Sequence, residues 1–280
     1  MEANMAYGSD YKYIPATTLK SGAITRVLPD VFCYTIQVAN MIFIGHPEKS
    51  EFVLVDAGMP RSAHKIIKTA EKIYGKGSRP KAIILTHGHF DHVGAIIELI
   101  NQWNVPVYAH AYELPYLTGE FDYPEPDPSV EGGLIAKVSS FFPKKAIQIG
   151  EHVEELPSDG SVPFVDDFRW IHTPGHTPGH VSFFRDLDRM LIAGDAFITV
   201  KQDSLCKTFA QTVEIHGPPR YFTTDWNAAH ESVKTLNDLH PAFAITGHGR
   251  PVFGNNLTTG LNKLAADFER VAVPDKGKYV

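Results

Sequence analysis

Three histidines and an aspartate lie close together in residues 86–92, Thr-His-Gly-His-Phe-Asp-His. Imidazole is a good ligand for zinc and its first-row neighbours, and an ionised carboxylate adds the negative charge that a dication requires. In an extended segment His87 and His89 point to the same side, because side chains alternate along a strand. A turn into a helix near Asp91 would carry Asp91 and His92 towards a second point. This one loop could therefore supply ligands to two metal positions.

A histidine-rich surface loop is the alternative interpretation of this segment, because neutral histidines are common near turns. An isolated pair of histidines would favour that alternative. Here four potential ligands directly follow the apolar run Ala82-Ile83-Ile84-Leu85, which predicts a strand. Several ligand types gathered after a strand favour a metal site.

The same arrangement recurs along the chain, where short apolar strands end in an acidic residue or a histidine with glycine nearby. These further candidates are Asp56, His176, Asp195 and His248. Strands fix position and the loops at their ends carry chemistry, while glycine allows close approach of the backbone. Each residue alone could be an ordinary turn or loop residue, but together they indicate a site assembled from several strand ends.

The elements that must position these residues follow from hydrophobic periodicity and from β-branched and aromatic content. Strands are predicted over 23–27, 31–38, 41–44, 51–55, 81–85, 105–108, 169–172, 181–184, 190–193 and 242–246. Helices are predicted over 61–75, 92–103, 134–142, 225–239 and 256–270. This order predicts an α/β fold in which helices pack against sheets. No linker-like stretch divides the chain, so a single domain over 1–280 is expected.

Residues 111–145 interrupt this order and form a predicted insertion. Three prolines within residues 123–128 exclude a regular helix or a central strand there. A long irregular insertion in a compact domain is typical of a lid over a site, and a surface elaboration or an oligomer contact would explain it equally well. Tyr116 and Tyr123, like Tyr221 later in the chain, could bring a phenol to the site.

Composition limits the class of protein. The chain has 280 residues, of which 43% are hydrophobic and 21% charged, as in a globular protein with a large core. The formal net charge of -6 argues against nucleic acid as a partner, because phosphate binding needs a basic face. Only Cys33 and Cys206 are present, and we expect two free thiols in a reducing compartment.

No apolar run approaches the length that spans a bilayer, and residues 1–7 lack the basic and apolar regions of a secretory signal. We therefore expect a cytoplasmic protein with a small-molecule substrate and without a membrane or nucleic-acid partner. Homo-oligomer formation is left open.

The chain resembles the metallo-β-lactamase superfamily over most of its length. The resemblance rests on the order and spacing of His87-x-His89-x-Asp91-His92, His176, Asp195 and His248, and on Asp56 in an early Val-Asp-Ala-Gly motif. It implies a four-layer αβ/βα sandwich with the metal site at one edge of the two sheets.

Two divalent metal ions and their ligands are implied by this resemblance. One ion would be held by His87, His89 and His176. The other would be held by Asp91, His92 and His248, with Asp195 bridging the two ions. Asp56 would lie beneath the site and steady the loop or a ligand imidazole without touching metal. Zinc is the default for such donors, and manganese or iron would fit the same set.

The resemblance further implies hydrolysis by a metal-bridging hydroxide, with Asp91 as the residue that relays a proton to the leaving group. Within the superfamily the chain looks most like glyoxalase-II-like and lactonase-like hydrolases, which predicts a carboxylic ester, lactone or thioester as substrate. Ile198 departs from the N-acyl homoserine lactonases, which have tyrosine three residues after the bridging aspartate. Residues 199–224 form a second loop whose Lys201, Lys207 and Arg220 could meet an anionic group.

Three other functions remain open at this point. Some members of the superfamily use iron for redox chemistry, as persulfide dioxygenases do, and others hydrolyse phosphodiesters. A scaffold with a vestigial site is the third alternative, although the full set of ligands argues against it.

Overall fold

The computed structural model describes residues 5–131, 133–200 and 213–280. The chain forms two compact units, each of which contains one sheet. Unit 1 comprises Met1–Tyr123 with Pro143–Asp166, and unit 2 comprises Pro124–Phe142 with Asp167–Val280.

Unit 1 contains a seven-stranded mixed sheet whose spatial order follows the chain from β1 to β7. Its strands are β1 (Ile24–Leu28), β2 (Val31–Ile36), β3 (Ala39–Ile44), β4 (Val53–Val55), β5 (Ile83–Ile84), β6 (Val107–Ala109) and β7 (Val153–Glu155). The strands from β1 to β4 pair antiparallel, and those from β4 to β7 pair parallel. The parallel strands β4, β5 and β6 end at the same edge, where loops can carry ligands.

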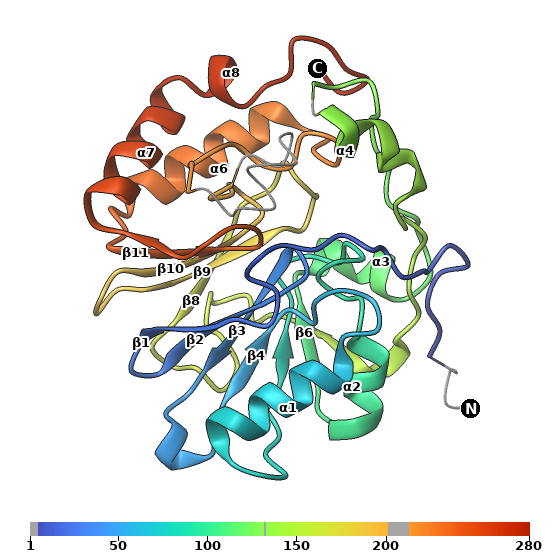
Figure 1. Cartoon of the computed structure of the whole chain (residues 1–280), viewed down its shortest axis with the longest axis vertical. Helices are drawn as coiled ribbons and strands as arrows, with labels where there is room; N and C mark the ends of the chain where they lie inside the picture. The colour runs from blue at the N-terminus through green and yellow to red at the C-terminus, as the bar shows by residue number, and fades with distance from the viewer. Residues whose placement is uncertain (1–4, 132, 201–212) are drawn as a thin grey trace. The chain divides into compact units, whose positions relative to one another are not determined.

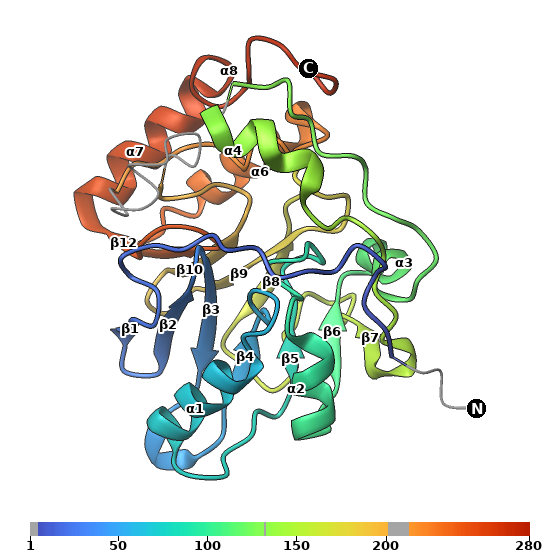
Figure 2. The ribbon, with the colours of Figure 1, turned by 45° about the vertical axis from the view of Figure 1, so that its right-hand side comes forward.

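Helices α1 (Ala63–Tyr74) and α2 (Ile96–Trp103) connect the parallel strands and lie against the same sheet (Figure 1). Figure 2 shows α2 beside β5 and β6. Their buried side chains, including Ile66 of α1 and Leu99 of α2, join one core with every second residue of the strands, such as Phe32 and Tyr34 of β2. This core holds β4 and β5 in place, and these are the strands from which the first candidate ligands follow.

Unit 2 contains a five-stranded sheet in the order β12-β11-β10-β9-β8. Its strands are β8 (Arg169–His172), β9 (Val181–Arg185), β10 (Met190–Gly194), β11 (Phe243–Thr246) and β12 (Val252–Phe253). Only the pair of β10 and β11 is parallel. Both of these central strands therefore end on the same side, which places the residues after them near one another.

Helices α6 (Trp226–Asp238) and α7 (Gly254–Ala266) cover this second sheet. Leu257, Leu261 and Leu264 follow one face of α7 and are buried, as the period of 3.6 requires. Asp225 caps α6 by accepting a hydrogen bond from the Ala228 amide at 2.9 Å. The short helix α8 (Phe268–Val271) ends the helical region.

The predicted α/β class is confirmed, and two predicted helices differ in their limits. The helix predicted over 92–103 begins only at Ile96, because residues before it form turns. Gly94 explains the delay, since its amide donates to Gly58 at 2.7 Å and a Cβ on it would lie 2.3 Å from the nitrogen of Pro60. The helix predicted over 256–270 is divided into α7 and α8.

The predicted insertion over 111–145 is shared by the two units and contains short helices. They are the 3-10 turns η2 (Ala111–Glu113) and η3 (Ser139–Phe141) with the helices α3 (Leu114–Leu117) and α4 (Gly133–Val138). Two more 3-10 turns, η1 (Pro47–Lys49) and η4 (Gly150–His152), lie in unit 1. Whether the insertion acts as a lid stays a prediction.

Cys33 is a buried free thiol on β2, and Cys206 lies outside the described residues. Across the ranges that the structure describes, none of the helices combines the length and the apolar character needed to cross a bilayer.

Candidate metal centre

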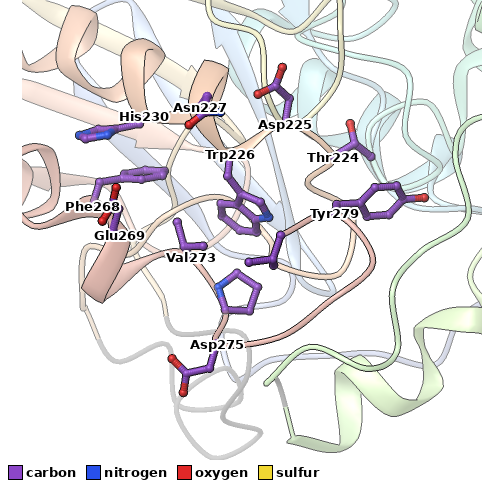
Figure 3. Close-up of a pocket in the computed structure, with 12 residues that line it drawn as sticks. Thr224, Asp225, Trp226, Asn227, His230, Phe268, Glu269, Val273, Asp275 and Tyr279 are labelled. Atoms are coloured by element: carbon purple, nitrogen blue, oxygen red, sulfur yellow. The ribbon is translucent and has the colours of Figure 1, made fainter.

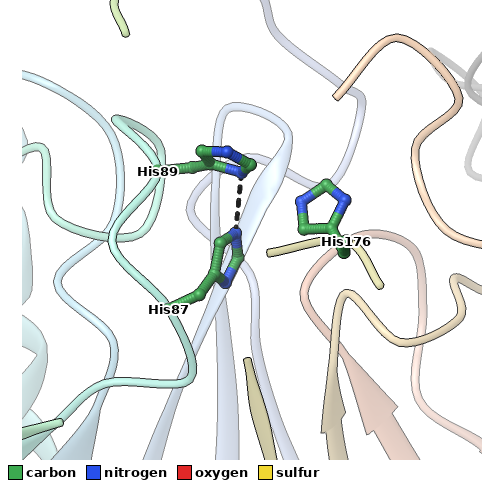
Figure 4. Close-up of side chains that lie close together, drawn as sticks. All are labelled: His87, His89 and His176. Atoms are coloured by element: carbon green, nitrogen blue, oxygen red, sulfur yellow. Dashed lines mark hydrogen bonds between the residues drawn. The ribbon is translucent and has the colours of Figure 1, made fainter. Parts of the chain in front are cut away.

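The loop that follows β5 carries the first group of candidate ligands, all within unit 1. His87 and His92 are fully buried, while His89 is 3% and Asp91 is 8% exposed. Nε2 of His87 lies 3.1 Å from Nδ1 of His89, and Figure 4 draws this pair together with His176 of unit 2. Two imidazole nitrogens bound to one tetrahedral zinc ion lie about 3.3 Å apart, given Zn–N bonds of about 2.0–2.1 Å. The pair is therefore spaced as two ligands of one ion.

Asp56 at the end of β4 supports this loop from the neighbouring strand. Its Oδ1 accepts the Thr86 amide at 2.8 Å, and its Oδ2 lies 2.8 Å from Nδ1 of His92. It also accepts a hydrogen bond from the Thr86 hydroxyl at 2.9 Å. Asp56 is 1% exposed, so its charge is compensated by these donors and not by water.

These contacts select the nitrogen that each imidazole can offer to a metal. A carboxylate only accepts hydrogen bonds, so Nδ1 of His92 carries the proton and Nε2 carries the lone pair. Nδ1 of His87 is likewise within 3.1 Å of the Thr86 hydroxyl, which directs Nε2 towards His89. The candidate ligands of unit 1 therefore fit a divalent metal in two respects. The tautomers of His87 and His92 leave Nε2 available, and the nitrogens of His87 and His89 have the spacing of two ligands.

Gly88 separates the two paired histidines and is held from the other side of the loop. Its amide donates to Oε2 of Glu113 at 2.9 Å and to the hydroxyl of Tyr123 at 3.0 Å. Tyr123 in turn donates its phenolic proton to Glu113. Burial and the neighbouring Glu113 carboxylate raise the pKa of Tyr123 well above its usual range, so the phenol keeps its proton. Tyr123 was expected from the sequence as a phenol that could reach the site, and Glu113 was not.

Unit 2 presents the second group of candidate ligands, each in a loop after a strand. His176 follows β8, Asp195 follows β10 and His248 follows β11, and each is 2% exposed. Oδ2 of Asp195 lies 3.2 Å from Nε2 of His248 and 3.5 Å from Nε2 of His176. One carboxylate oxygen thus faces two imidazoles at distances that separate neighbouring ligands of a metal ion.

Three further contacts fix these residues in unit 2. The Asp195 amide donates to Nε2 of His180 at 2.9 Å, and Nδ1 of His180 lies 3.1 Å from the carbonyl oxygen of Thr173. Nδ1 of His176 lies 3.2 Å from the hydroxyl of Thr223. His180, which is fully buried, therefore supports Asp195 through its backbone.

The glycine before His176 is required by space as well as by backbone angle. Gly175 has a φ of +127°, and a Cβ on it would lie 2.3 Å from the Ala229 amide nitrogen in α6. Its carbonyl accepts the amides of Thr224 and Asp225 at the start of that helix. The first turn of α6 thereby holds the loop that carries His176.

Residues of the two loops over 111–145 and 199–224 lie in different surroundings. Leu117 is part of the core of unit 1, and Phe142 packs against Tyr221 and Phe222 in unit 2. Arg220 donates from Nε to the Ala272 carbonyl at 2.8 Å and from Nη2 to the Val271 carbonyl at 3.1 Å, so it binds the end of α8. Lys201 and Lys207 lie outside the described residues.

A cavity of about 510 Å³ lies in unit 2, at the start of α6 (Figure 3). Trp226, Phe268 and Tyr279 contribute aromatic walls, and Asp225 and Asp275 contribute carboxylates. None of the predicted metal ligands lines this cavity. The cavity and the two groups of candidate ligands therefore have no residue in common.

Comparison with known proteins identifies the family. The model of the metallo-beta-lactamase superfamily matches residues 34–248, which include both groups of candidate ligands. The chain is 51% identical to "Probable metallo-hydrolase YflN" of Bacillus subtilis (strain 168), covering 90% of this chain and 96% of that protein.

Two further proteins are similar to the chain. It is 28% identical to "Hydroxyacylglutathione hydrolase GloC" of Haemophilus influenzae, covering 56% of this chain and 65% of that protein. The crystal structure of TTHA1623 in a di-iron-bound form is similar at a TM-score of 0.51 and 27% identity, covering 81% of this chain and 92% of that one.

These comparisons confirm the predicted fold and the predicted enzyme class, and divalent metal binding follows from the family. The chain belongs to the metallo-β-lactamase superfamily and is one of its metal-dependent hydrolases.

Proposed function

We propose that the chain binds two divalent metal ions and uses them to hydrolyse a small carboxylic ester, lactone or thioester. The observation that carries this proposal is the pair of buried donor groups, one in each unit, which both match the spacing of metal ligands. Each group lies in loops that follow strands. Asp56 contacts His92 of the group in unit 1, and His180 accepts a hydrogen bond from the Asp195 amide of the group in unit 2.

The number of donors supports two ions instead of one. A tetrahedral zinc ion takes about four ligands, and the chain offers more than that. The proposed ligands of the first ion are His87, His89 and His176, and those of the second are Asp91, His92 and His248. Asp195 is proposed to bridge, because one of its oxygens faces both imidazoles of unit 2.

Bound dications would supply an activated water at neutral pH and polarise the substrate carbonyl. The chain's own residues do the remaining work. The buried imidazoles hold their lone pairs in fixed directions, because hydrogen bonds set their tautomers. Asp91 is the proposed residue that carries a proton to the leaving group. Its 8% exposure is the largest among the candidate ligands of this loop, which leaves a path for that proton.

A thioester is the first substrate to test. The similarity to a protein named hydroxyacylglutathione hydrolase supports it, since that name denotes cleavage of an acyl group from sulfur. Ile198 is 1% exposed and pairs with His216 in a β-bridge, so that position offers no phenol to a lactone. The proposed substrate is a small molecule, and the buried free thiol of Cys33 supports a reducing compartment such as the cytoplasm.

The test is a hydrolysis panel on metal-replete protein, comprising acyl thioesters, lactones, aryl esters, phosphodiesters and β-lactams. We expect turnover of one of the first three classes, loss on removal of metal with a chelator, and recovery on return of zinc. His87→Ala and Asp195→Ala are the matched inactive controls, one from each unit. Activity confined to phosphodiesters or β-lactams would overturn the proposed substrate class, and activity that survives complete metal removal would overturn the metal mechanism.

An iron-dependent redox enzyme is the second candidate function, because one similar structure is described in a di-iron-bound form. Elemental analysis of protein purified without added metal, combined with an oxygen-uptake assay on persulfides, separates the two functions. Iron with oxygen consumption would favour the redox enzyme. Zinc or manganese with hydrolysis and no oxygen uptake would favour the hydrolase.

A further inference from the structure

We infer that Glu113 and Tyr123 are positioning residues for the metal ligands His87 and His89. They set the geometry of these two histidines by binding the backbone amide of Gly88, the residue between them. This inference rests on the proposed metal site and adds two residues from the insertion to it. These two side chains form the Glu113–Tyr123 pair.

The pair binds the amide of the peptide that joins His87 to Gly88. The Gly88 amide donates to Oε2 of Glu113 at 2.9 Å and to the Tyr123 hydroxyl at 3.0 Å, and Tyr123 donates to the same carboxylate. Glu113 is fully buried and Tyr123 is 5% exposed. Two buried hydrogen bonds from one amide restrict the rotation of this peptide.

Glycine is needed at position 88 because the Tyr123 hydroxyl lies so close to its backbone. Its φ lies outside the left-handed region, so backbone angle does not require glycine there. A Cβ at this position would lie 2.5 Å from the Tyr123 hydroxyl and 3.0 Å from Cδ2 of Leu117. The phenol thus occupies the space that a side chain at 88 would fill.

The ring of Tyr123 also packs against the imidazole of His89. The two rings are 4.6 Å apart between centroids, at an interplanar angle of 58°. Tyr116 stacks on Tyr123 at 4.1 Å and 11°, which holds the phenol ring in place. The hydrogen bonds to the Gly88 amide and the ring contact with Tyr123 together limit the orientation of the His89 imidazole.

Tyr123 is assigned a positioning role because its hydroxyl is already engaged within unit 1. A phenol has one proton to donate, and Tyr123 gives it to Glu113 while accepting from Gly88. The effect of the pair must therefore pass through His87 and His89 to the ion that they bind. His92 has an additional support, since Nδ1 of its ring lies 2.8 Å from Oδ2 of Asp56.

The experiment measures zinc affinity directly, so it needs no substrate. Metal-free wild type, Tyr123→Phe and Glu113→Gln are titrated with Zn²⁺ in competition with a chromophoric chelator, and Co²⁺ spectra are recorded in parallel. We expect two equivalents in the wild type. In both variants the affinity for one equivalent should fall by about 10–100-fold, the usual effect of losing a residue that orients a ligand. Affinity for the other equivalent should change far less.

Tyr116→Phe is the matched control, because it removes a phenolic oxygen from the same aromatic stack without touching the Gly88 amide. We expect it to bind both equivalents as the wild type does. If Glu113→Gln fails to fold, the milder Tyr123→Phe still decides the question.

Two different failures can be told apart. Two equivalents in the wild type and unchanged affinity in both variants would overturn this inference alone, even if the variants were less stable to heat. A wild type that binds no zinc would overturn the proposed metal site and the inference with it.

Discussion

Oδ2 of Asp56 lies 2.8 Å from Nδ1 of His92, and both side chains are at most 1% exposed. The same carboxylate binds the Thr86 amide through Oδ1, so one buried charge fixes a loop backbone and a ligand tautomer together. Asp56 has a φ of 62°, in the left-handed region that aspartate and asparagine tolerate better than other residues.

Asp56→Asn isolates the charge of this carboxylate, because asparagine accepts the same backbone angles. The amide can accept from Thr86 or from His92 with its single oxygen, but it cannot serve both through two charged oxygens. We expect about a 10–100-fold loss of affinity for the ion that His92 binds, measured by chelator competition. Restored affinity in Asp56→Glu is not expected, since the longer side chain would shift both contacts. Wild-type affinity in Asp56→Asn would contradict the role of the charge.

The donors that follow strand ends could be named from the sequence for a simple physical reason. An apolar strand is a strong local signal, and the sheet brings the residues just after it to a known edge. His87, Asp195 and His248 all follow this rule, as does Asp56. The α/β class was predictable from the same alternation of strands and helices.

Glu113 could not be found in this way, because its contact with Gly88 joins residues 25 apart in sequence. It lies in an insertion without periodicity, and a glutamate between short helices is ordinarily exposed. The one available signal was an acidic residue in the otherwise apolar stretch Ala-Tyr-Glu-Leu-Pro-Tyr-Leu. The start of α2 was missed for a related reason, since the close approach of Gly94 to Pro60 is a tertiary contact.

Gly88→Ala should destabilise the metal-free protein by about 1–3 kcal/mol, the usual cost of adding a methyl group where no space exists. Combining it with Tyr123→Phe removes the hydroxyl that lies 2.5 Å from the new Cβ. The double variant should therefore be more stable than the sum of the two single effects predicts. Urea denaturation of the four proteins measures this coupling.

Gly88→Ala combined with Tyr116→Phe is the control for that cycle, because Tyr116 does not approach the position of the new Cβ. The two effects should add there. Equal coupling in both cycles would show that the clash with Tyr123 is not the cause.

Cys33 should make the stability of the protein depend on alkaline pH. Burial raises the pKa of its thiol from about 9.0 to about 12. The folded state therefore keeps a proton that the unfolded state releases, and the stability it contributes falls as pH rises from about 9 towards 12. The comparison is between Cys206→Ser and the double variant Cys206→Ser/Cys33→Ala. Between pH 8 and pH 10.5 the free energy of unfolding should fall less in the double variant than in Cys206→Ser. Parallel losses in urea denaturation would contradict this.

His180 is expected to support Asp195 through the hydrogen bond that it accepts from the Asp195 amide, which its variants can test. The Asp195 amide donates to Nε2 of His180 at 2.9 Å, so His180→Leu leaves a buried amide without its acceptor at a cost of about 1–3 kcal/mol. His180→Gln places an amide oxygen near the same point and should retain part of that stability. Denaturation of the metal-free variants checks this order, and equal stability of Gln and Leu would refute it.

The metal affinities of these variants distinguish the two supports of the site. Asp195 is the proposed bridge between both ions, so displacing its backbone in His180→Leu should weaken both zinc equivalents. The Glu113–Tyr123 pair binds the Gly88 amide between His87 and His89, so Tyr123→Phe should weaken mainly one. Chelator competition on the two variants side by side gives the comparison. A loss of only one equivalent in His180→Leu would mean that Asp195 serves a single ion and does not bridge.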